Sequence, residues 1–366
     1  MKYKQYNINL FNKDGWLDIQ EIAKQPFPFI FITGARGTGK TYGMLEEGVR
    51  AVENGRKKFI YMRRTDKQIK KLSNEAFNPY KPLNDDFGWD YAFTGIPGGE
   101  GITGVYHMVY NPEKDRIVPV GAPYGFGISL ASVAGLRGFA SSDVGYLYFD
   151  EFIREKGERA TMQDEGEILF NAYETINRNR ELEGQEPVKM ILASNSNSLN
   201  SDILLQWKLI HYYEVMQKNM FTAMAIPSRG ILLIMPKNSP ISKKKEGTAL
   251  YKMAGRHSQF SHMALDNEFS YDDYSYVKRM NVRQFKPVVH IGEISICENR
   301  DKNQNARIYV CKELPGHHKY SYHISESDRA RFARNHGRYL SEYMGGHVFF
   351  ESASDEYIFR KYYKLA

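Results

Sequence analysis

The eight residues from Gly34 to Thr41 carry the clearest chemical signal in the chain. They match the complete phosphate-loop pattern G-x-x-x-x-G-K-[ST]. Such a loop surrounds phosphates with backbone N–H groups, and the helix that follows adds the positive end of its dipole. We expect Lys40 to contact the β- and γ-phosphates and the Thr41 hydroxyl to bind Mg²⁺. The predicted nucleotide-binding residues are Gly34, Ala35, Arg36, Gly37, Thr38, Gly39, Lys40 and Thr41. The alternative is a glycine-rich turn that binds nothing.

An adjacent pair of acids, Asp150 and Glu151, ends the apolar run Tyr146–Phe149. This arrangement is typical of a Walker B strand. In that interpretation Asp150 holds Mg²⁺, and Glu151 polarises the attacking water as the general base. The alternative is an ordinary strand that ends in solvated acids.

Three further features could complete such a site. Asn195 ends the run Leu192–Asn195 and is a candidate sensor of the γ-phosphate, although asparagine is also common in turns. A guanidinium often stabilises the transferred phosphoryl group, and a neighbouring subunit often donates it. The candidates for this arginine are Arg178 and Arg180 in the segment INRNRE, Arg137 in GLRGF and Arg36 in the loop itself. Each could equally be an ordinary surface arginine.

The elements that must position these residues alternate between strands and helices over residues 26–200. The expected strands are Ile30–Thr33, Lys57–Arg63, Ile128–Ser132, Gly145–Phe149 and Val188–Ala193. The expected helices are Lys40–Glu53, Asp66–Ser73 and Glu165–Ile176. This alternation predicts an α/β domain with a mainly parallel sheet. Residues 78–125 are rich in Gly, Pro and aromatic residues, which indicates an inserted set of antiparallel strands and turns.

The domain organisation expected from these patterns has four parts. Residues 1–25 form an N-terminal extension with a short helix at 16–24, and residues 26–200 form the phosphate-loop domain. Residues 201–225 form a helical linker, and residues 226–366 form a smaller α+β domain. Its expected strands are Ile231–Met235, Val288–Cys297, Ala306–Cys311 and His347–Phe350, and its expected last helix is Glu326–Met344.

Composition indicates an anionic partner. The 366 residues carry a net charge of +7, which favours nucleic acid over a membrane because no basic amphipathic helix stands out. The two cysteines form no framework, no stretch is long and apolar enough to cross a bilayer, and we expect an intracellular protein. The candidates for DNA contact are Lys57, Lys58, Arg63, Arg64, Lys67, Lys70, Lys71, Lys243, Lys244 and Lys245.

Five segments then occur in a familiar order: FIFITGARGTGKTYGM, KFIYMRRTDK, YLYFDEFIREK, INRNRE and ILASNSNS. Together they resemble the genome-packaging (encapsidation) ATPases of small short-tailed Picovirinae phages. The segment MALDNEF at 263–269 is similar to a piece of the same family. The resemblance covers most of residues 29–200 and scattered points beyond them.

The resemblance implies a phosphate-loop ring ATPase of the additional-strand, catalytic-glutamate class that uses ATP and Mg²⁺. It implies a homo-oligomeric ring, expected to be a pentamer, that docks on the portal of a prohead and drives double-stranded DNA inside. By motif, Asp150 binds the metal, Glu151 is catalytic, Arg178 is the finger that acts in trans and Asn195 is the sensor. Such a protein would work in the host cytoplasm, transiently at the portal vertex and without a membrane. The sequence leaves open whether a structural RNA takes part.

The family is related to terminase large subunits, which join an ATPase to an RNase H-like nuclease. A two-metal nuclease needs several converging acids. The run Val288–Glu293 has no Asp at its centre, so we expect an RNase H-like but nuclease-inactive domain at 226–366. The first alternative is an active nuclease that uses Glu293 with Asp266, Glu268 or Asp355. The second is a phosphate-loop kinase or switch that acts without nucleic acid.

Overall fold

The chain divides into two units, which are described separately below. A computed structural model describes residues 3–96, 101–136, 141–155, 162, 164–195, 198–199, 201–255, 258, 261, 265, 275–312, 314, 316–323 and 325–365. The first unit comprises residues 1–207 and 215–270, and the second comprises residues 208–214 and 271–366. Arg137, Asp266 and Glu268 lie outside the described residues, as does most of the segment 263–269.

A mixed sheet forms the centre of the first unit. Within the described residues it has ten strands in the order β1-β9-β10-β2-β8-β7-β3-β6-β5-β4. Its parallel part is β10 Ile231–Ile234, β2 Phe29–Gly34, β8 Lys189–Asn195, β7 Val144–Asp150, β3 Lys58–Arg63 and β6 Arg116–Ser129. The strand that precedes the phosphate loop therefore lies next to β8, and β8 separates it from β7, which ends in the acidic pair. The predicted alternation of strands and helices is confirmed.

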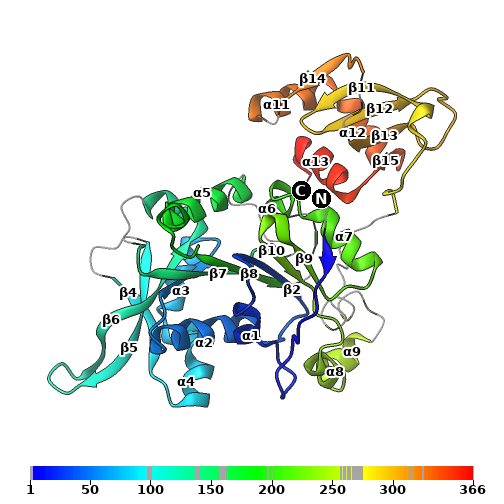
Figure 1. The fold of residues 1–366 in the computed structure, drawn as a ribbon. Helices are drawn as coiled ribbons and strands as arrows, with labels where there is room; N and C mark the ends of the chain where they lie inside the picture. The colour runs from blue at the N-terminus through cyan, green and yellow to red at the C-terminus, as the bar shows by residue number, and fades with distance from the viewer. Residues whose placement is uncertain are drawn as a thin grey trace. The chain divides into compact units, whose positions relative to one another are not determined.

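The sheet is covered on both faces because its central strands are apolar on both sides. Ile30 and Ile32 of β2 pack in one core with Met44 and Leu45, whereas Phe31 makes edge-on ring contacts with Phe152 and Trp207. Successive side chains of a strand point to opposite faces, so β2 contributes to two cores. Figure 1 shows α1 to α4 on one face and α5 and α6 on the other. These helices are α1 Ile19–Ala23, α2 Lys40–Glu53, α3 Asp66–Leu72, α4 Lys81–Phe87, α5 Glu165–Asn177 and α6 Asp202–Gln206.

Helix ends follow local sequence signals. The Thr65 side chain and Gln68 form a reciprocal capping box at the start of α3. At the C-terminal end of α2, Asn54 is the C-cap. Gly55 follows with a φ of 71°, a left-handed conformation that glycine adopts without steric cost. The expected α2 and α3 are therefore confirmed to within a residue.

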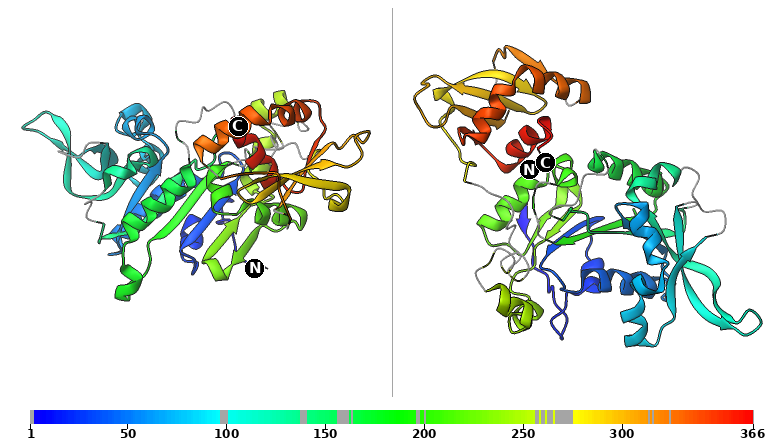
Figure 2. Two further views of the ribbon diagram at one scale, coloured as in Figure 1. Left: turned by 90° about the horizontal axis from the view of Figure 1, so that it is seen from above. Right: turned by 180° about the vertical axis from the view of Figure 1, so that it is seen from behind.

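Antiparallel strands extend the sheet at both edges. At one edge β9 Ala223–Ile226 pairs with β10, and the short strand β1 Lys4–Gln5 pairs with β9. At the other edge β5 Ile102–Asn111 pairs with both β6 and β4 Tyr91–Gly95. The ends of β5 and β6 project as a two-stranded ribbon beyond the rest of the sheet (Figures 1 and 2). The antiparallel insertion is confirmed, although it also contains α4, which the sequence did not predict.

The expected division at residue 226 is wrong. The run Ile231–Ile234 is not a strand of the second domain but β10, which pairs in parallel with β2 in the first sheet. All four of its residues are buried, as a parallel strand covered on both faces requires. Residues 201–225 likewise form no simple linker, because they contain α6, β9 and α7 Ile210–Lys218, within which the division between the units falls. Among the residues described up to Gly255, the helices α8 Pro240–Glu246 and α9 Ala249–Ala254 follow in the first unit.

In the part of the second unit that the structure describes, the centre is a five-stranded sheet in the order β14-β11-β12-β13-β15. These strands are β11 Phe285–Ile291, β12 Ile294–Asn299, β13 Ile308–Lys312, β14 Tyr320–Tyr322 and β15 Val348–Phe350. The central three strands are antiparallel, whereas the two edge strands run parallel to their neighbours. The helices α11 Glu326–Asn335, α12 Gly337–Met344 and α13 Ala353–Tyr362 pack their apolar faces into the core of this sheet.

Two elements expected as single pieces in this unit are each divided. The run Val288–Cys297 turns at Gly292, whose φ of 56° is a left-handed conformation, and so contributes to both β11 and β12. The expected helix Glu326–Met344 is broken at His336, which has non-helical φ and ψ angles of −126° and 31°. His336 is buried, stacks on Tyr339 and lies 3.0 Å from the hydroxyl oxygen of Tyr322. These tertiary contacts of one side chain explain why the helix does not continue.

Asp355 is a buried acid at the start of α13, and its titration should be measurable. Burial raises the pKa of its carboxyl to about 7, although a hydrogen bond from Ser352 opposes the shift. Because the folded-state pKa lies above the unfolded value, the contribution to stability is present at low pH and is lost as pH rises from about 4 to 7. We expect Asp355→Asn to stabilise the second unit at pH 8, by up to about 4 kcal/mol at 1.36 kcal/mol per pKa unit.

Scanning calorimetry of the full chain at pH 5 and pH 8 checks this expectation. The variant should gain more thermal stability over wild type at pH 8 than at pH 5. The same pH dependence in both proteins would contradict it.

Candidate nucleotide site

The phosphate loop lies between the carboxyl end of β2 and the start of α2. Gly37 and Gly39 take φ values of 66° and 94°, a region that L side chains rarely adopt. Gly39 is also the N-cap of α2, and a Cβ built there would lie 3.4 Å from the ring of Trp16. The predicted loop, Gly34 to Thr41, therefore has the backbone bends that the motif requires.

Lys40 is buried and points back into the loop. Its ammonium donates to the carbonyl oxygens of Gly34 at 3.2 Å and Ala35 at 2.7 Å, and to Asn195 Oδ1 at 3.2 Å. Burial is the main cause that lowers the pKa of Lys40 to about 8, and the charge of Asp150 acts in the opposite direction. The structure thus brings the candidate sensor Asn195 into direct contact with the loop lysine.

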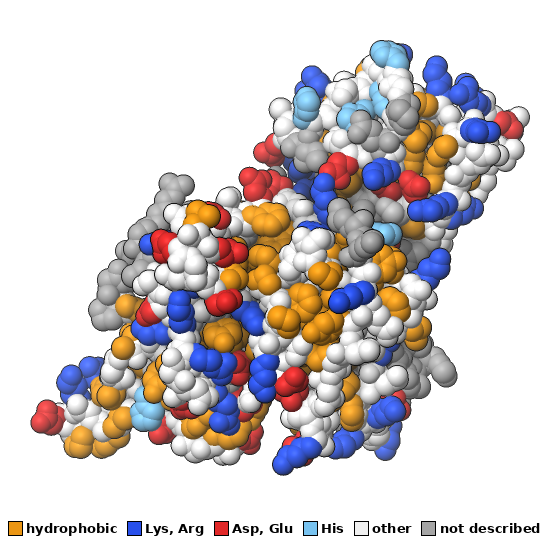
Figure 3. All heavy atoms as spheres, in the orientation of Figure 1, with side chains coloured by type: hydrophobic (Ala, Val, Ile, Leu, Met, Phe, Trp, Pro, Cys, Tyr) orange, Lys and Arg blue, Asp and Glu red, His pale blue; other side chains and the backbone are white. Residues whose placement is uncertain are grey.

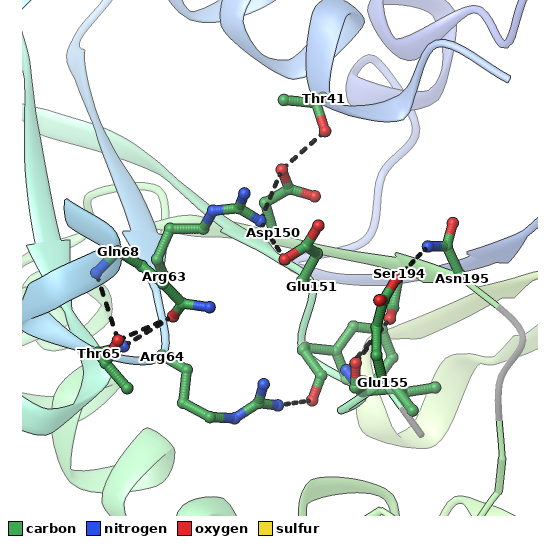
Figure 4. Close-up of polar contacts among 12 residues, drawn as sticks. Thr41, Arg63, Arg64, Thr65, Gln68, Asp150, Glu151, Glu155, Ser194 and Asn195 are labelled. Atoms are coloured by element: carbon green, nitrogen blue, oxygen red, sulfur yellow. Dashed lines mark hydrogen bonds and ion pairs between the residues drawn. The ribbon is translucent and has the colours of Figure 1, made fainter. Parts of the chain in front are cut away.

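Thr41 and Asp150, the two predicted Mg²⁺ ligands, are in contact. The Thr41 hydroxyl donates to Asp150 Oδ2 at 2.7 Å, although the two residues are 109 positions apart. Asp150 Oδ2 also accepts from the hydroxyl of Tyr61 at 2.8 Å. The guanidinium of Arg63 lies 3.3 Å from the same oxygen (Figure 4). A buried carboxylate with these partners is held in one orientation.

Glu151 directly follows β7 and has an unusual backbone conformation. Its φ of 59° is left-handed, which is uncommon for a residue other than glycine and is found mainly where surrounding contacts fix it. Here the Glu151 N–H donates to the carbonyl of Ala193 in β8 at 2.8 Å. Its carboxylate forms an ion pair with Arg63 at 2.8 Å (Figure 4). The contacts with β8 and with Arg63 therefore fix the orientation of this carboxylate.

A second acid, Glu155, connects the loop to the end of β8. Arg36 Nη2 lies 3.0 Å from Glu155 Oε1, and Asn195 Nδ2 donates to the same oxygen at 3.5 Å. Arg36 therefore reaches across the mouth of the loop. Glu155 lies in the segment DEFIREK and is not among the residues predicted from the sequence.

A cavity of about 470 Å³ lies beside the phosphate loop. Its lining combines the loop with Trp16, Tyr42, Asp150, Glu151, Ser194, Asn195 and Lys245. A cavity of about 510 Å³ adjoins it and is lined by the N-terminal segment, α2 and the end of α4. Trp16, Gly39 and Tyr42 line both cavities. The two cavities therefore share a boundary beside the start of α2.

The candidate arginine fingers differ in their accessibility. Arg178 is the C-cap of α5, is exposed and has a φ of 51°. Arg180 is only 5% exposed and donates to the carbonyl oxygen of Ser141, so it is not available to a second subunit. Arg137 lies outside the described residues, and Arg36 belongs to the loop. Arg178 does not line the cavity of its own chain.

Two expected DNA contacts, Arg63 and Arg64, are wrong because their side chains are used inside the first unit. Arg63 holds the acidic pair described above. Arg64 is only 2% exposed, forms an ion pair with Glu165 of α5 at 3.0 Å and donates to the carbonyl of Phe152 at 2.9 Å. Lys245 lines the cavity beside the phosphate loop and is half-buried, so its contact with DNA stays a prediction. A basic pair at the end of a strand cannot be distinguished from a DNA contact by sequence alone.

Other candidates for DNA contact stay predictions. Lys67, Lys70 and Lys71 are exposed on or beside α3, and Lys57, Lys243 and Lys244 are also exposed. Lys58 forms an ion pair with Asp143 at 2.9 Å. On the face drawn in Figure 3 the basic side chains are scattered among acidic ones and form no single stripe.

The site and the fold define the class of protein: a mixed α/β protein with a phosphate loop at the carboxyl edge of a parallel sheet. The model of the Podovirus DNA encapsidation protein family (Gp16) matches residues 116–353, which is more than half of the chain. The chain therefore belongs to this family, as the motifs indicated. The phosphate loop lies before the matched residues.

Curated relatives and solved structures agree with this assignment. The DNA packaging protein of Bacillus phage B103 is 25% identical over 249 residues, which cover 68% of this chain and 66% of the relative. That of Bacillus phage phi29 is 26% identical over 250 residues, which cover 68% of this chain and 64% of the relative. The chain thus spans slightly less than two thirds of these relatives.

The fold is similar to that of two packaging motors. The structure of the bacteriophage Phi-29 viral genome packaging motor assembly matches with a TM-score of 0.63 and 22% identity, over 98% of this chain and 99% of that one. The Phi-28 gp11 DNA packaging motor matches with a TM-score of 0.62 and 17% identity, over 97% and 98% of the two chains. At these identities the likeness concerns the fold.

Proposed function

We propose that the chain is an ATP hydrolase that moves double-stranded DNA through a portal into a preformed viral capsid. The observation that carries this proposal is the meeting of the phosphate loop, Asp150 and Glu151 at one edge of the sheet in a member of the encapsidation family. The strand order, with β8 between β2 and β7, supports the additional-strand class of phosphate-loop ATPases. The relatives' descriptions as DNA packaging proteins support the substrate.

ATP binding would use the loop first. Backbone N–H groups of the loop and the start of α2 receive the phosphates, and Lys40 exchanges its carbonyl contacts for the β- and γ-phosphates. The adjoining cavity, bounded by Trp16, Tyr42 and Phe87, has room for the nucleoside. Asn195 touches Lys40 and lies beside the terminal phosphate in this arrangement, which suits a sensor.

The oxygen ligands of this site fit Mg²⁺. Thr41 Oγ1 and Asp150 Oδ2 are hard oxygen donors from two elements, already 2.7 Å apart. When bound, Mg²⁺ neutralises charge on the β- and γ-phosphates. Glu151 then accepts a proton from the attacking water, and its left-handed backbone and Arg63 keep the carboxylate directed into the cavity.

Arg178 would complete the site from outside. It is exposed at the end of α5 and does not line the cavity of its own chain, so it is suited to a neighbouring subunit. A guanidinium donated in trans stabilises the charge that develops on the transferred phosphoryl group. We therefore propose a homo-oligomeric ring, expected to be a pentamer, that docks on the portal of a prohead in the host cytoplasm. Within the described residues, no helix is long and apolar enough to span a membrane.

The pKa of Lys40 predicts a pH dependence of nucleotide affinity. With a pKa of about 8, the free protein loses the Lys40 charge above that pH, whereas bound phosphates favour the charged form. ATP affinity should therefore be greatest below pH 8 and fall about tenfold between pH 7 and pH 9. Titration calorimetry with a non-hydrolysable ATP analogue measures this. A Lys40→Arg variant serves as the control, because its guanidinium stays charged and its affinity should be flat over the range. A flat wild-type profile would contradict the prediction.

The second unit is proposed to be RNase H-like and to lack nuclease activity. Glu293 forms an ion pair with Lys208 at 2.6 Å, and Asp355 is buried at the start of α13. Among the described residues, no group of three or more His, Cys, Asp or Glu side chains could hold a metal ion. Incubation of the full chain with plasmid DNA and Mn²⁺ tests the proposal, and metal-dependent cleavage would favour the terminase-type alternative.

Packaging itself is tested with proheads assembled from the capsid and portal proteins encoded with this chain. We expect ATP-dependent protection of DNA from added nuclease, and a hydrolysis rate that rises when DNA and portal-bearing proheads are both present. Proheads without portal are the control. Hydrolysis that ignores DNA and proheads would instead favour the phosphate-loop kinase or switch. RNase treatment of the proheads before assembly tests the open question of a structural RNA.

A further inference from the structure

Lys245 lies at the phosphate loop although it is more than 200 residues away in the chain. Its ammonium donates to the carbonyl oxygens of Arg36 and Gly37, both at 2.7 Å. A Cβ built on Gly37 would come within 2.3 Å of Lys245 Nζ, so glycine leaves the space that this side chain fills. Lys245 is also one of the residues that line the cavity with Asp150 and Glu151.

The fold brings Lys245 to this position through β10 and α8. Pro240 at the start of α8 lies directly over Gly15, where a Cβ would come within 2.7 Å of the proline ring. Ile241 is buried, and Lys245 follows four residues later on the same face of the helix. Lys243 and Lys244, by contrast, are exposed. One lysine of the three is thus directed into the site by the packing of the helix.

The charges of the cavity favour a phosphate partner for this side chain. Lys40, Lys245 and Arg36 all line the cavity, facing the two acids Asp150 and Glu151. The three cations are crowded, because the charges of Lys245 and Arg36 both lower the pKa of Lys40. Among the described residues, Lys245 forms no ion pair with any carboxylate. Carbonyl oxygens are weaker partners for an ammonium than the oxygens of a phosphate, so an incoming triphosphate relieves the crowding.

We infer that Lys245 is a ligand of the terminal phosphate of bound ATP, donated in cis by the segment that follows β10. This inference rests on the proposed function, because it assumes that the loop binds ATP. The flexible four-carbon stem of lysine allows the ammonium to leave the carbonyls of Arg36 and Gly37 for the adjacent phosphate. Binding of ATP, but not of ADP, then draws the C-terminal end of α8 onto the nucleotide.

Affinities of the full chain for ATP analogue and ADP test the inference. We expect Lys245→Gln to weaken binding of a non-hydrolysable ATP analogue about tenfold, the loss typical of one charge-assisted hydrogen bond, and to change ADP affinity less than twofold. Lys245→Arg should stay within about threefold of wild type for both ligands, because it keeps the charge. Lys252→Gln, which removes an exposed lysine of α9, is the matched control and should bind both ligands as wild type does.

The ADP measurement also shows that the variant is folded. Equal losses for ADP and the ATP analogue would overturn the inference, as would unchanged or tighter binding of the analogue, since a lysine that only braces the empty loop competes with nucleotide. Failure of the wild-type chain to bind ATP at all would instead reject the proposed function.

Discussion

A Glu151→Gln variant should bind ATP as tightly as wild type and yet fail to hydrolyse it. Glutamine keeps the shape of the side chain and its reach into the cavity but cannot accept a proton from water. The loop and its contacts with Lys40 are left in place. Loss of a general base typically lowers kcat by about 10²–10⁴-fold. Single-turnover hydrolysis and nucleotide affinity, measured on the same preparation, separate the chemical step from binding.

The matched control for this variant is Glu167→Gln, which neutralises an exposed acid on α5. It should hydrolyse ATP at the wild-type rate. Turnover of the Glu151 variant close to wild type would reject Glu151 as the base. Loss of ATP affinity without a change in the chemical step would mean that the carboxylate serves binding, through its ion pair with Arg63.

Two variants that are each inactive alone should together restore ATP hydrolysis when they are mixed in one ring. Arg178→Ala removes the proposed trans finger, a change that lowers hydrolysis about 10³–10⁵-fold in comparable enzymes. Lys40→Ala disables the phosphate loop but leaves Arg178 in place. In an equal mixture of the two, a quarter of the sites have an intact loop beside a neighbour with Arg178, so about a quarter of wild-type hydrolysis should return.

Hydrolysis by each variant alone and by the mixture, all bound to proheads, checks this expectation. If Arg178 acts in cis, the mixture stays as inactive as its components. If the Arg178→Ala ring alone keeps wild-type hydrolysis, another arginine is the finger, and Arg137 is the next to test. Arg180 is excluded from that role by its burial and its contact with Ser141.

The parts of the site that the sequence predicted are those that a short contiguous pattern specifies. The phosphate loop needs glycines at fixed positions, and the acidic pair needs only an apolar strand before it. The strand that ends in Asn195 was found for the same reason. Because parallel strands end at one edge of the sheet, the three patterns meet in space, as Thr41, Asp150 and Asn195 do.

The residues that the sequence missed are placed by contacts between distant segments. Trp16 reaches the site because an N-terminal loop packs on Gly39, and Lys245 reaches it because β10 joins the first sheet. The sequence pattern places Ile231–Met235 in the second domain, and it therefore gives no reason to expect α8, the helix that follows this strand, near the loop. Arg63 gave one usable signal, because it ends a strand whose neighbour in the sheet ends in two acids.

The adjacency of Arg63 and Arg64 has a mechanical consequence. The Arg63 guanidinium pairs with Glu151, the proposed general base, and Arg64 forms an ion pair with Glu165 at the start of α5, whose other end is capped by Arg178. Two consecutive residues therefore connect the proposed general base of one subunit to the helix that, in the proposed ring, this subunit presents to its neighbour. We propose that a shift of Arg63 on arrival or departure of the γ-phosphate is passed to this helix rather than to a loop, which offers the ring a short and stiff path between successive nucleotide sites.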